Sequence, residues 1–153
     1  FKDIPKVMKD AVLSIEDARF YQHGGVDYIG LLRASLANLG RAKSQGASTI
    51  TMQLAALINP ALGRAGQRGV LDKFAQMRAA HALDARWSKR QILEAWLNLL
   101  PLRGDVVGVD AAARLLAGRP AATLEPAENA VLVAIICNRG DRYLSTGVYD
   151  AQP

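Results

Sequence analysis

The sequence is poor in the residues that would place it in a specialised class of protein. Its single cysteine, Cys137, cannot form an internal disulfide, and one cysteine with two histidines cannot complete a structural zinc site. The longest apolar run, residues 130–137, has eight residues, whereas a membrane-spanning helix needs about 20. No signal peptide opens the chain, so we expect any anchor of a parent protein to lie outside it. Its 153 residues, half of them hydrophobic, predict one compact soluble domain.

Positive charge is concentrated in one stretch of the chain. Residues 28–78 contain seven basic residues and one acidic residue, a net charge of +6, whereas the whole chain carries +5. Such a stretch favours an anionic partner, which leaves phospholipid, pyrophosphate and nucleic acid open. Nucleic acid is the weakest of the three, because we find no reader motif and no aromatic stacking platform. The alternative is that these side chains are simply solvated, as most lysines and arginines are.

Apolar residues at helical spacing predict a mainly α fold. We expect helices over residues 4–21, 28–39, 71–86, 110–117 and 127–134. Another helix should begin among Ser48, Thr49 and Thr51, and the capping box of Ser88 and Gln91 should open a helix that runs through Asn98. Residues 40–46 and 59–69 have loop composition. Near the C-terminus, residues 131–136 suit a strand as well as a helix, and residues 139–148 have turn and strand chemistry.

The first group of chemically active residues is EDARFYQHGG, residues 16–25. Glu16 follows Ile15, which the helical pattern predicts to be buried, so its carboxylate should be partly desolvated. A carboxylate in that position can accept a proton from a sugar hydroxyl. The alternative is a surface Glu-Asp pair beside a helix cap formed by His23 and the two glycines.

The second group is GASTITMQ, residues 46–53, at an expected helix start. Amides of a first helical turn lack intrahelical partners and attract anions, so these hydroxyls and amides could hold a phosphate. Arg64, Arg68 and Lys73 follow and would supply counter-charge for a diphosphate. The alternative is an ordinary Ser/Thr helix cap.

These two groups, in this order, resemble the glycosyltransferase family 51 domain, the peptidoglycan glycosyltransferase module of class A penicillin-binding proteins. The similarity is closest to the penicillin-binding protein 1C branch. The matching motifs lie at residues 16–25, 46–53, 88–98 and 103–112, and LEPAE at residues 124–128 fits the helix after them. The resemblance covers residues 1–134 of the chain. The four motifs occur in the order of the family, which is a stronger signal than any one of them alone.

The resemblance implies a truncated, lysozyme-like domain that polymerises lipid II into glycan strands with inversion and release of undecaprenyl diphosphate. It would work at the periplasmic face of the bacterial inner membrane, with residues 28–39 facing the lipid. Glu16 would be the general base on the acceptor 4-hydroxyl. No cofactor follows with certainty; Mg²⁺ and Mn²⁺ are the candidates, and no metal ligand is assigned. The residues that would bind substrate and diphosphate are Asp17, Phe20, His23, Ser48, Thr49, Gln53, Lys73, Gln76 and Arg103.

Three positions depart from the family pattern. Gln76 stands where most members have a glutamate, Asp72 where an arginine is usual, and Ala56 where a lysine is expected. A neutral amide cannot act as a carboxylate, and the other two changes lower the local positive charge. A catalytically weak or silent module that binds lipid II or glycan is therefore the alternative to an active transferase. A lysozyme-like hydrolase with Glu16 as general acid is a third possibility.

The C-terminal segment resembles a different protein. Residues 129–148 are similar to the C-terminal end of cysteine synthase B, a pyridoxal-phosphate enzyme. The segment contains no Schiff-base lysine motif and no phosphate-binding glycine loop, so we infer no cofactor from it. We interpret residues 135–153 as an appended, strand-like tail that covers apolar surface of the domain formed by residues 1–134.

Overall fold

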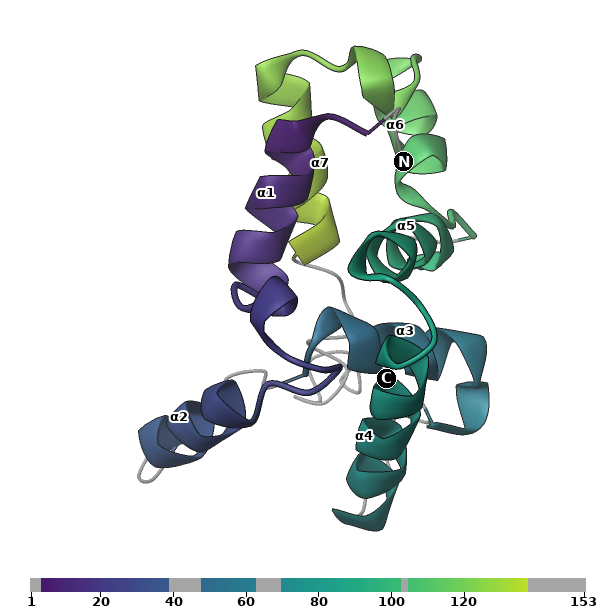
Figure 1. Cartoon of the computed structure of the whole chain (residues 1–153). Coiled ribbons are helices and arrows are strands. Elements are labelled where there is room, and N and C mark those ends of the chain that lie inside the picture. Colours follow the sequence, from purple (N-terminus) through teal and green to yellow (C-terminus); the bar gives the residue numbers. More distant parts are fainter. Residues whose placement is uncertain (1–3, 39–47, 63–69, 103–104, 138–153) are drawn as a thin grey trace, which may run out of the picture.

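The computed structural model describes residues 4–38, 48–62, 70–102 and 105–137 (Figure 1). This part of the chain is mainly helical, as the sequence predicted, and its only β pairing is one isolated bridge between Pro101 and Val107. The α-helices are α1 (Lys6–Glu16), α2 (Tyr28–Asn38), α3 (Ile50–Ile58), α4 (Val70–Asp84), α5 (Lys89–Leu99), α6 (Val109–Ala117) and α7 (Pro126–Cys137). Three single-turn 3₁₀ helices join them: η1 (Phe20–Gln22), η2 (Pro60–Leu62) and η3 (Ala121–Thr123).

Helix α3 lies at the centre of the lower half of the molecule and packs against both α4 and α5, while α1 runs alongside α7 (Figure 1). The core is continuous from α1 through α5 to α7. Helix α5 shows why: its predicted apolar stripe is fully buried, and the expected Ser88–Gln91 capping box closes its first turn. The stripe consists of Ile92, Leu93, Trp96, Leu97 and Leu100.

Helix α1 ends at Glu16, earlier than the sequence predicted. Its buried residues are Met8 and Val12, and Ile4 just before the helix is also buried. The three are spaced four apart, so the next residue on that face is Glu16. The expectation that Ile15 is buried was wrong: its side chain lies off this stripe and is 52% exposed. The shift matters because the same stripe turns the Glu16 side chain toward the interior side of the helix.

Helix α7 continues to Cys137 without a break, so the helical alternative holds for residues 131–137. Ile136 is fully buried against the core, which stabilises the last turn. The turn and strand chemistry predicted for residues 139–148 lies outside the described residues.

Helix α2 projects away from the other helices (Figure 1). Its base is attached through a small apolar cluster around Met52 and Ala80, and the Tyr28 hydroxyl lies 2.8 Å from Nε2 of His81 on α4. Most of its apolar side chains are exposed: Tyr28, Ile29, Leu32 and Leu36. These side chains of α2 are therefore not buried in the core. None of the helices within the described ranges is long and apolar enough to span a bilayer.

Two glycines with positive φ allow a test of close packing. Gly25 has φ +88°, and a Cβ built there would lie 2.5 Å from the carbonyl oxygen of Ala80. Gly118 has φ +70°, and its Cβ would meet no atom within 4 Å. Both Gly→Ala changes should cost about 1–2 kcal/mol for the backbone conformation, and Gly25→Ala should cost about 1–3 kcal/mol more for displacing α4. Urea unfolding of the two variants measures the difference, and equal losses would contradict the expectation.

Candidate active site

A cavity of about 220 Å³ opens between the end of α1, the base of α2 and the start of α3. Its lining places the Glu16 carboxylate in the same recess as the Ser48 hydroxyl, although the two residues are far apart in the sequence. The complete lining is Glu16, Asp17, Ala18, Arg19, Asp27, Gly30, Arg33, Ser48 and Thr49. Residues from both groups singled out by the sequence, 16–25 and 46–53, thus line one cavity.

The Glu16 carboxylate is half-buried and held by a neighbour on α3. Gln53 Nε2 donates a hydrogen bond to Glu16 Oε2 at 3.1 Å. The oxygen of the same amide accepts from the indole Nε1 of Trp96 on α5 at 3.2 Å. The carboxylate is therefore fixed at the edge of the cavity rather than free to sample bulk water.

A cation contacts the Ser48 side chain. Lys73 Nζ, from α4, donates to Ser48 Oγ at 2.6 Å and to Gln76 Oε1 at 3.2 Å. Gln76 Nε2 in turn donates to the Met52 carbonyl oxygen at 3.0 Å. An amide can make both contacts, whereas a carboxylate at this position could accept from Lys73 but could not donate to Met52. The departure at Gln76 is therefore compatible with a well-placed Lys73.

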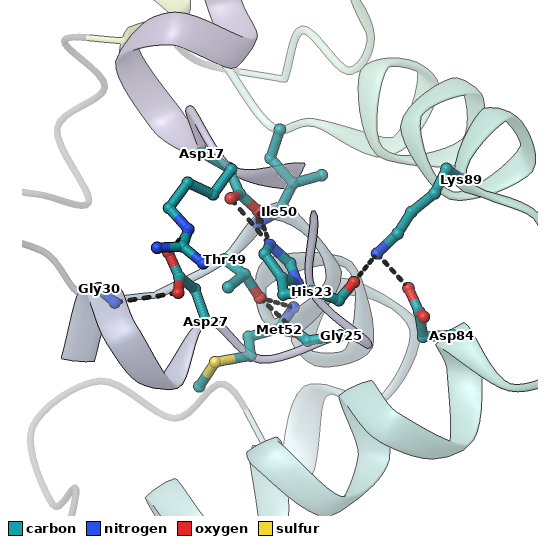
Figure 2. A network of polar contacts seen from close by, with 11 residues as sticks. Asp17, His23, Gly25, Asp27, Gly30, Thr49, Ile50, Met52, Asp84 and Lys89 are labelled. Atoms are coloured by element: carbon teal, nitrogen blue, oxygen red, sulfur yellow. Dashed lines mark hydrogen bonds and ion pairs between the residues drawn. The ribbon is translucent and has the colours of Figure 1, made fainter. Parts of the chain in front are cut away.

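Asp17 and His23 contact each other in the interior beside the cavity (Figure 2). Their side chains are 2% and 5% exposed, and His23 Nε2 lies 2.9 Å from Asp17 Oδ1. Asp17 Oδ2 also accepts a hydrogen bond from the Ile50 amide at 3.0 Å. The pair therefore joins the segment after α1 to the first turn of α3.

Thr49 is the N-cap of α3, which is the ordinary interpretation of this Ser/Thr cluster. Its hydroxyl accepts from the Met52 amide at 3.1 Å and donates to the Gly25 carbonyl at 2.6 Å (Figure 2). Two first-turn amides, those of Ile50 and Met52, are thus already engaged by Asp17 and Thr49. The expectation that this helix start offers free amides to a phosphate does not hold for these two.

Lys89 contacts Phe20 and His23 in the segment that follows α1. Phe20 is 1% exposed and belongs to the core, and Lys89 Nζ lies 4.8 Å from its ring centre. Lys89 also donates to the His23 carbonyl at 2.6 Å and to Asp84 Oδ1 at 2.5 Å (Figure 2). Lys89 lies within the third motif but was not among the predicted site residues.

Three charged residues of the cavity were not predicted as site residues. Arg19 Nε lies 3.5 Å from Asp27 Oδ2, and Asp27 Oδ1 accepts from the Gly30 amide at 2.9 Å. Arg33, on α2, also lines the cavity. Arg19 lies inside the first motif and Asp27 closely follows it, but only the fold shows that both line the recess. Arg103, the remaining predicted site residue, lies outside the described residues.

The carboxylates that line the cavity are the candidate ligands for a metal ion. Asp17 and Asp27 line the cavity with Glu16, but the first is engaged by His23 and the second by Arg19 and the Gly30 amide. Among the residues that the structure describes, no three His, Cys, Asp or Glu side chains come together as a metal site. The described side chains therefore do not fit a resident Mg²⁺ or Mn²⁺, and we derive no step through one.

Sequence comparisons match the chain to one family. The transglycosylase family model matches residues 1–147. The chain is 39% identical over 132 residues to a putative transglycosylase of Cupriavidus necator, covering 86% of this chain and 55% of that protein. It is 38% identical over 139 residues to a biosynthetic peptidoglycan transglycosylase of Nitrosomonas eutropha, covering 90% and 55%. It is 35% identical over 140 residues to penicillin-binding protein 1A of Clostridium tetani, covering 88% and 17%.

One family model thus matches, over almost its whole length, a mainly helical domain in which Glu16 and Ser48 line one recess and Lys73 contacts Ser48. The chain belongs to the transglycosylase family. It spans from about a sixth to about half the length of these curated relatives. The match extends into the segment that we interpreted as an appended tail, and the tail and the 1C branch both stay predictions.

Proposed function

We propose that this chain is a peptidoglycan glycosyltransferase, a hexosyltransferase that polymerises lipid II into glycan strands with inversion. The observation that carries the proposal is the shared recess, in which the Glu16 carboxylate and the Ser48 hydroxyl line one cavity and Lys73 contacts Ser48. Glycosyl transfer from a diphosphate needs a base and a cation. Glu16 is the proposed base and Lys73 the proposed cation.

Glu16 and Lys73 have different roles in the proposed reaction. Glu16 takes the proton from the acceptor 4-hydroxyl as that oxygen forms a bond to the anomeric carbon of the donor. The bond from this carbon to the diphosphate breaks, and undecaprenyl diphosphate leaves with the electron pair. Lys73 stabilises the charge that develops on the leaving oxygens. A positioned base contributes about 10²–10⁴ in rate.

The other predicted site residues are proposed to support these two. Gln53 orients the Glu16 carboxylate, and Gln76 orients Lys73. Asp17, His23, Phe20 and Thr49 hold the loop and the first turn of α3 in place, and any contact they make with substrate is secondary to that role. Ser48 is proposed to contact the diphosphate together with Lys73, and Arg103 to add a further cation.

We propose that the domain works at the periplasmic face of the bacterial inner membrane, on lipid II and the growing glycan strand. The exposed apolar side chains of α2 support this, because they offer a surface to lipid on a helix that also contributes Gly30 and Arg33 to the recess. No role for nucleic acid is proposed.

The test of this function is polymer formation from labelled lipid II, with detergent and with a divalent cation present. A ladder of glycan products supports the transferase. Binding of lipid II without a ladder supports the alternative, a silent binding module, which Gln76 and Ala56 suggested. Release of soluble muropeptides from finished cell wall would instead indicate a hydrolase.

Replacing Lys73 with methionine should weaken lipid II binding by about 10- to 100-fold, because a charge-assisted hydrogen bond contributes about 1.5–3 kcal/mol. Lys73→Arg should keep part of the affinity, since the charge remains. Arg78→Met is the matched control: it removes one positive charge from an exposed position of the same helix. Titration of labelled lipid II measures all three, and equal losses for Lys73→Met and Arg78→Met would contradict a local role for Lys73.

A further inference from the structure

Trp96 reaches the Glu16 carboxylate through a single intervening side chain. Its indole Nε1 donates to Gln53 Oε1 at 3.2 Å, and Gln53 Nε2 donates to Glu16 Oε2 at 3.1 Å. The three residues come from α5, α3 and α1, so three helices meet in one hydrogen-bonded chain that ends on the proposed base.

The chemistry of the donors fixes the direction of this chain. An indole nitrogen can only donate, so Gln53 must turn its oxygen toward Trp96. The NH₂ group of the same amide then faces Glu16, and it can donate to an ionised carboxylate. The opposite orientation would place the Gln53 oxygen against the Glu16 carboxylate, where two acceptors repel each other. Trp96 therefore selects the amide orientation that holds Glu16.

Trp96 is rigid enough to impose this choice. It has no exposed surface and lies in the main core cluster, whereas Glu16 and Gln53 are half-buried. Close packing limits a buried indole to one orientation. The fixed indole therefore holds the Gln53 amide, and this amide holds the Glu16 carboxylate at the edge of the recess.

We propose that Trp96 is a positioning residue for glycosyl transfer, which fixes the Gln53 amide and through it the Glu16 carboxylate. This inference rests on the proposed function, because the orientation of Glu16 matters only if Glu16 is the base. Positioning of a reacting group changes the chemical step more than the affinity for substrate. The effect of removing the indole donor should therefore fall on kcat.

Kinetics of Trp96→Phe test the proposal. We expect kcat for polymer formation to fall about tenfold and KM to stay within about twofold. Trp96→Tyr should recover part of the loss, because its hydroxyl can donate. Trp87→Phe is the matched control, the same change at the exposed tryptophan between α4 and α5, and it should leave both constants unchanged. A wild-type kcat for Trp96→Phe, with an unchanged melting temperature, would overturn the proposal.

A double-mutant cycle separates positioning from packing. With Gln53→Leu already in place, Trp96→Phe should lower kcat by less than about twofold further, because the connection is already cut. The same tenfold loss in that background would show that Trp96 acts by packing alone and would overturn the proposal.

A second measurement does not depend on turnover. The chain has two tryptophans, so its ¹H–¹⁵N spectrum should contain two indole signals, which Trp87→Phe assigns. Glu16→Ala should shift the Trp96 signal and leave that of Trp87 in place, and in the Gln53→Leu background it should shift neither. An unmoved Trp96 signal would overturn the proposal. If the wild-type chain makes no polymer, the proposed function fails, and the indole signals still decide whether the chain of contacts exists.

Discussion

Glu16→Gln should reduce polymer formation from lipid II by about 10²–10⁴-fold, the contribution of a positioned general base. Glutamine has the size of glutamate, and its amide oxygen can still accept the hydrogen bond that Gln53 Nε2 donates to Glu16. What it cannot do is take a proton from the acceptor hydroxyl. Lipid II binding should therefore stay within about twofold, and the loss should appear in kcat.

Asp10→Asn is the matched control for Glu16→Gln. Asp10 is an exposed acidic residue on the same helix, so its change removes the same charge without touching the recess. Polymer formation by Asp10→Asn should equal that of the wild type. Wild-type activity of Glu16→Gln, with both melting temperatures unchanged, would remove Glu16 from the mechanism and with it the proposed function.

Asp17→Ala should have the largest effect on stability. The buried Asp17 carboxylate accepts from the Ile50 amide and contacts His23 Nε2, so its removal leaves two buried polar groups without that acceptor. Each group left unsatisfied costs about 1–3 kcal/mol, so we expect a loss of about 3 kcal/mol from the free energy of unfolding. Against a typical total of about 5–15 kcal/mol, this is a large fraction.

Urea unfolding and thermal melting measure the Asp17 effect. Asp17→Asn should lose less than Asp17→Ala, because its one amide oxygen can replace only part of the carboxylate. Asp105→Ala, at an exposed position, should leave stability unchanged. If Asp17→Ala were as stable as Asp105→Ala, the contacts of Asp17 with His23 and the Ile50 amide would not stabilise the fold. A direct role for Asp17 in binding substrate would then be the better explanation.

The element pattern was predictable because it depends on near neighbours in the chain. The Ser88–Gln91 capping box and the Thr49 cap are hydrogen bonds between residues three positions apart, and both are present as expected. The buried stripe of α5 follows from spacing alone. The end of α1 was not predictable in this way. The residue after its last turn, Asp17, accepts a hydrogen bond from the amide of Ile50, which lies 33 residues further along the chain.

The candidate site was predictable as a set of residues but not as a geometry. The family resemblance implied that Glu16, Ser48 and Lys73 share one site, and the structure brings Glu16 to the recess that Ser48 lines and Lys73 to Ser48. Trp96 was predicted only as part of a buried stripe, since spacing shows which face is buried and not where an indole proton goes. Lys89 was missed for the same reason: its partners include a carbonyl 66 residues away.

The sequence by itself therefore determined that this protein is mainly helical and where most helices lie, and it predicted that an acidic, a hydroxyl-rich and a basic segment belong to one site. Only the tertiary structure decided that Glu16 rather than Ile15 continues the inner face of α1, that Gln76 contacts both Lys73 and the Met52 carbonyl, and that the Trp96 indole donates to Gln53. The physical reason is that secondary structure depends on contacts within one or two turns, whereas these contacts join residues from different helices and exist only after the helices have packed.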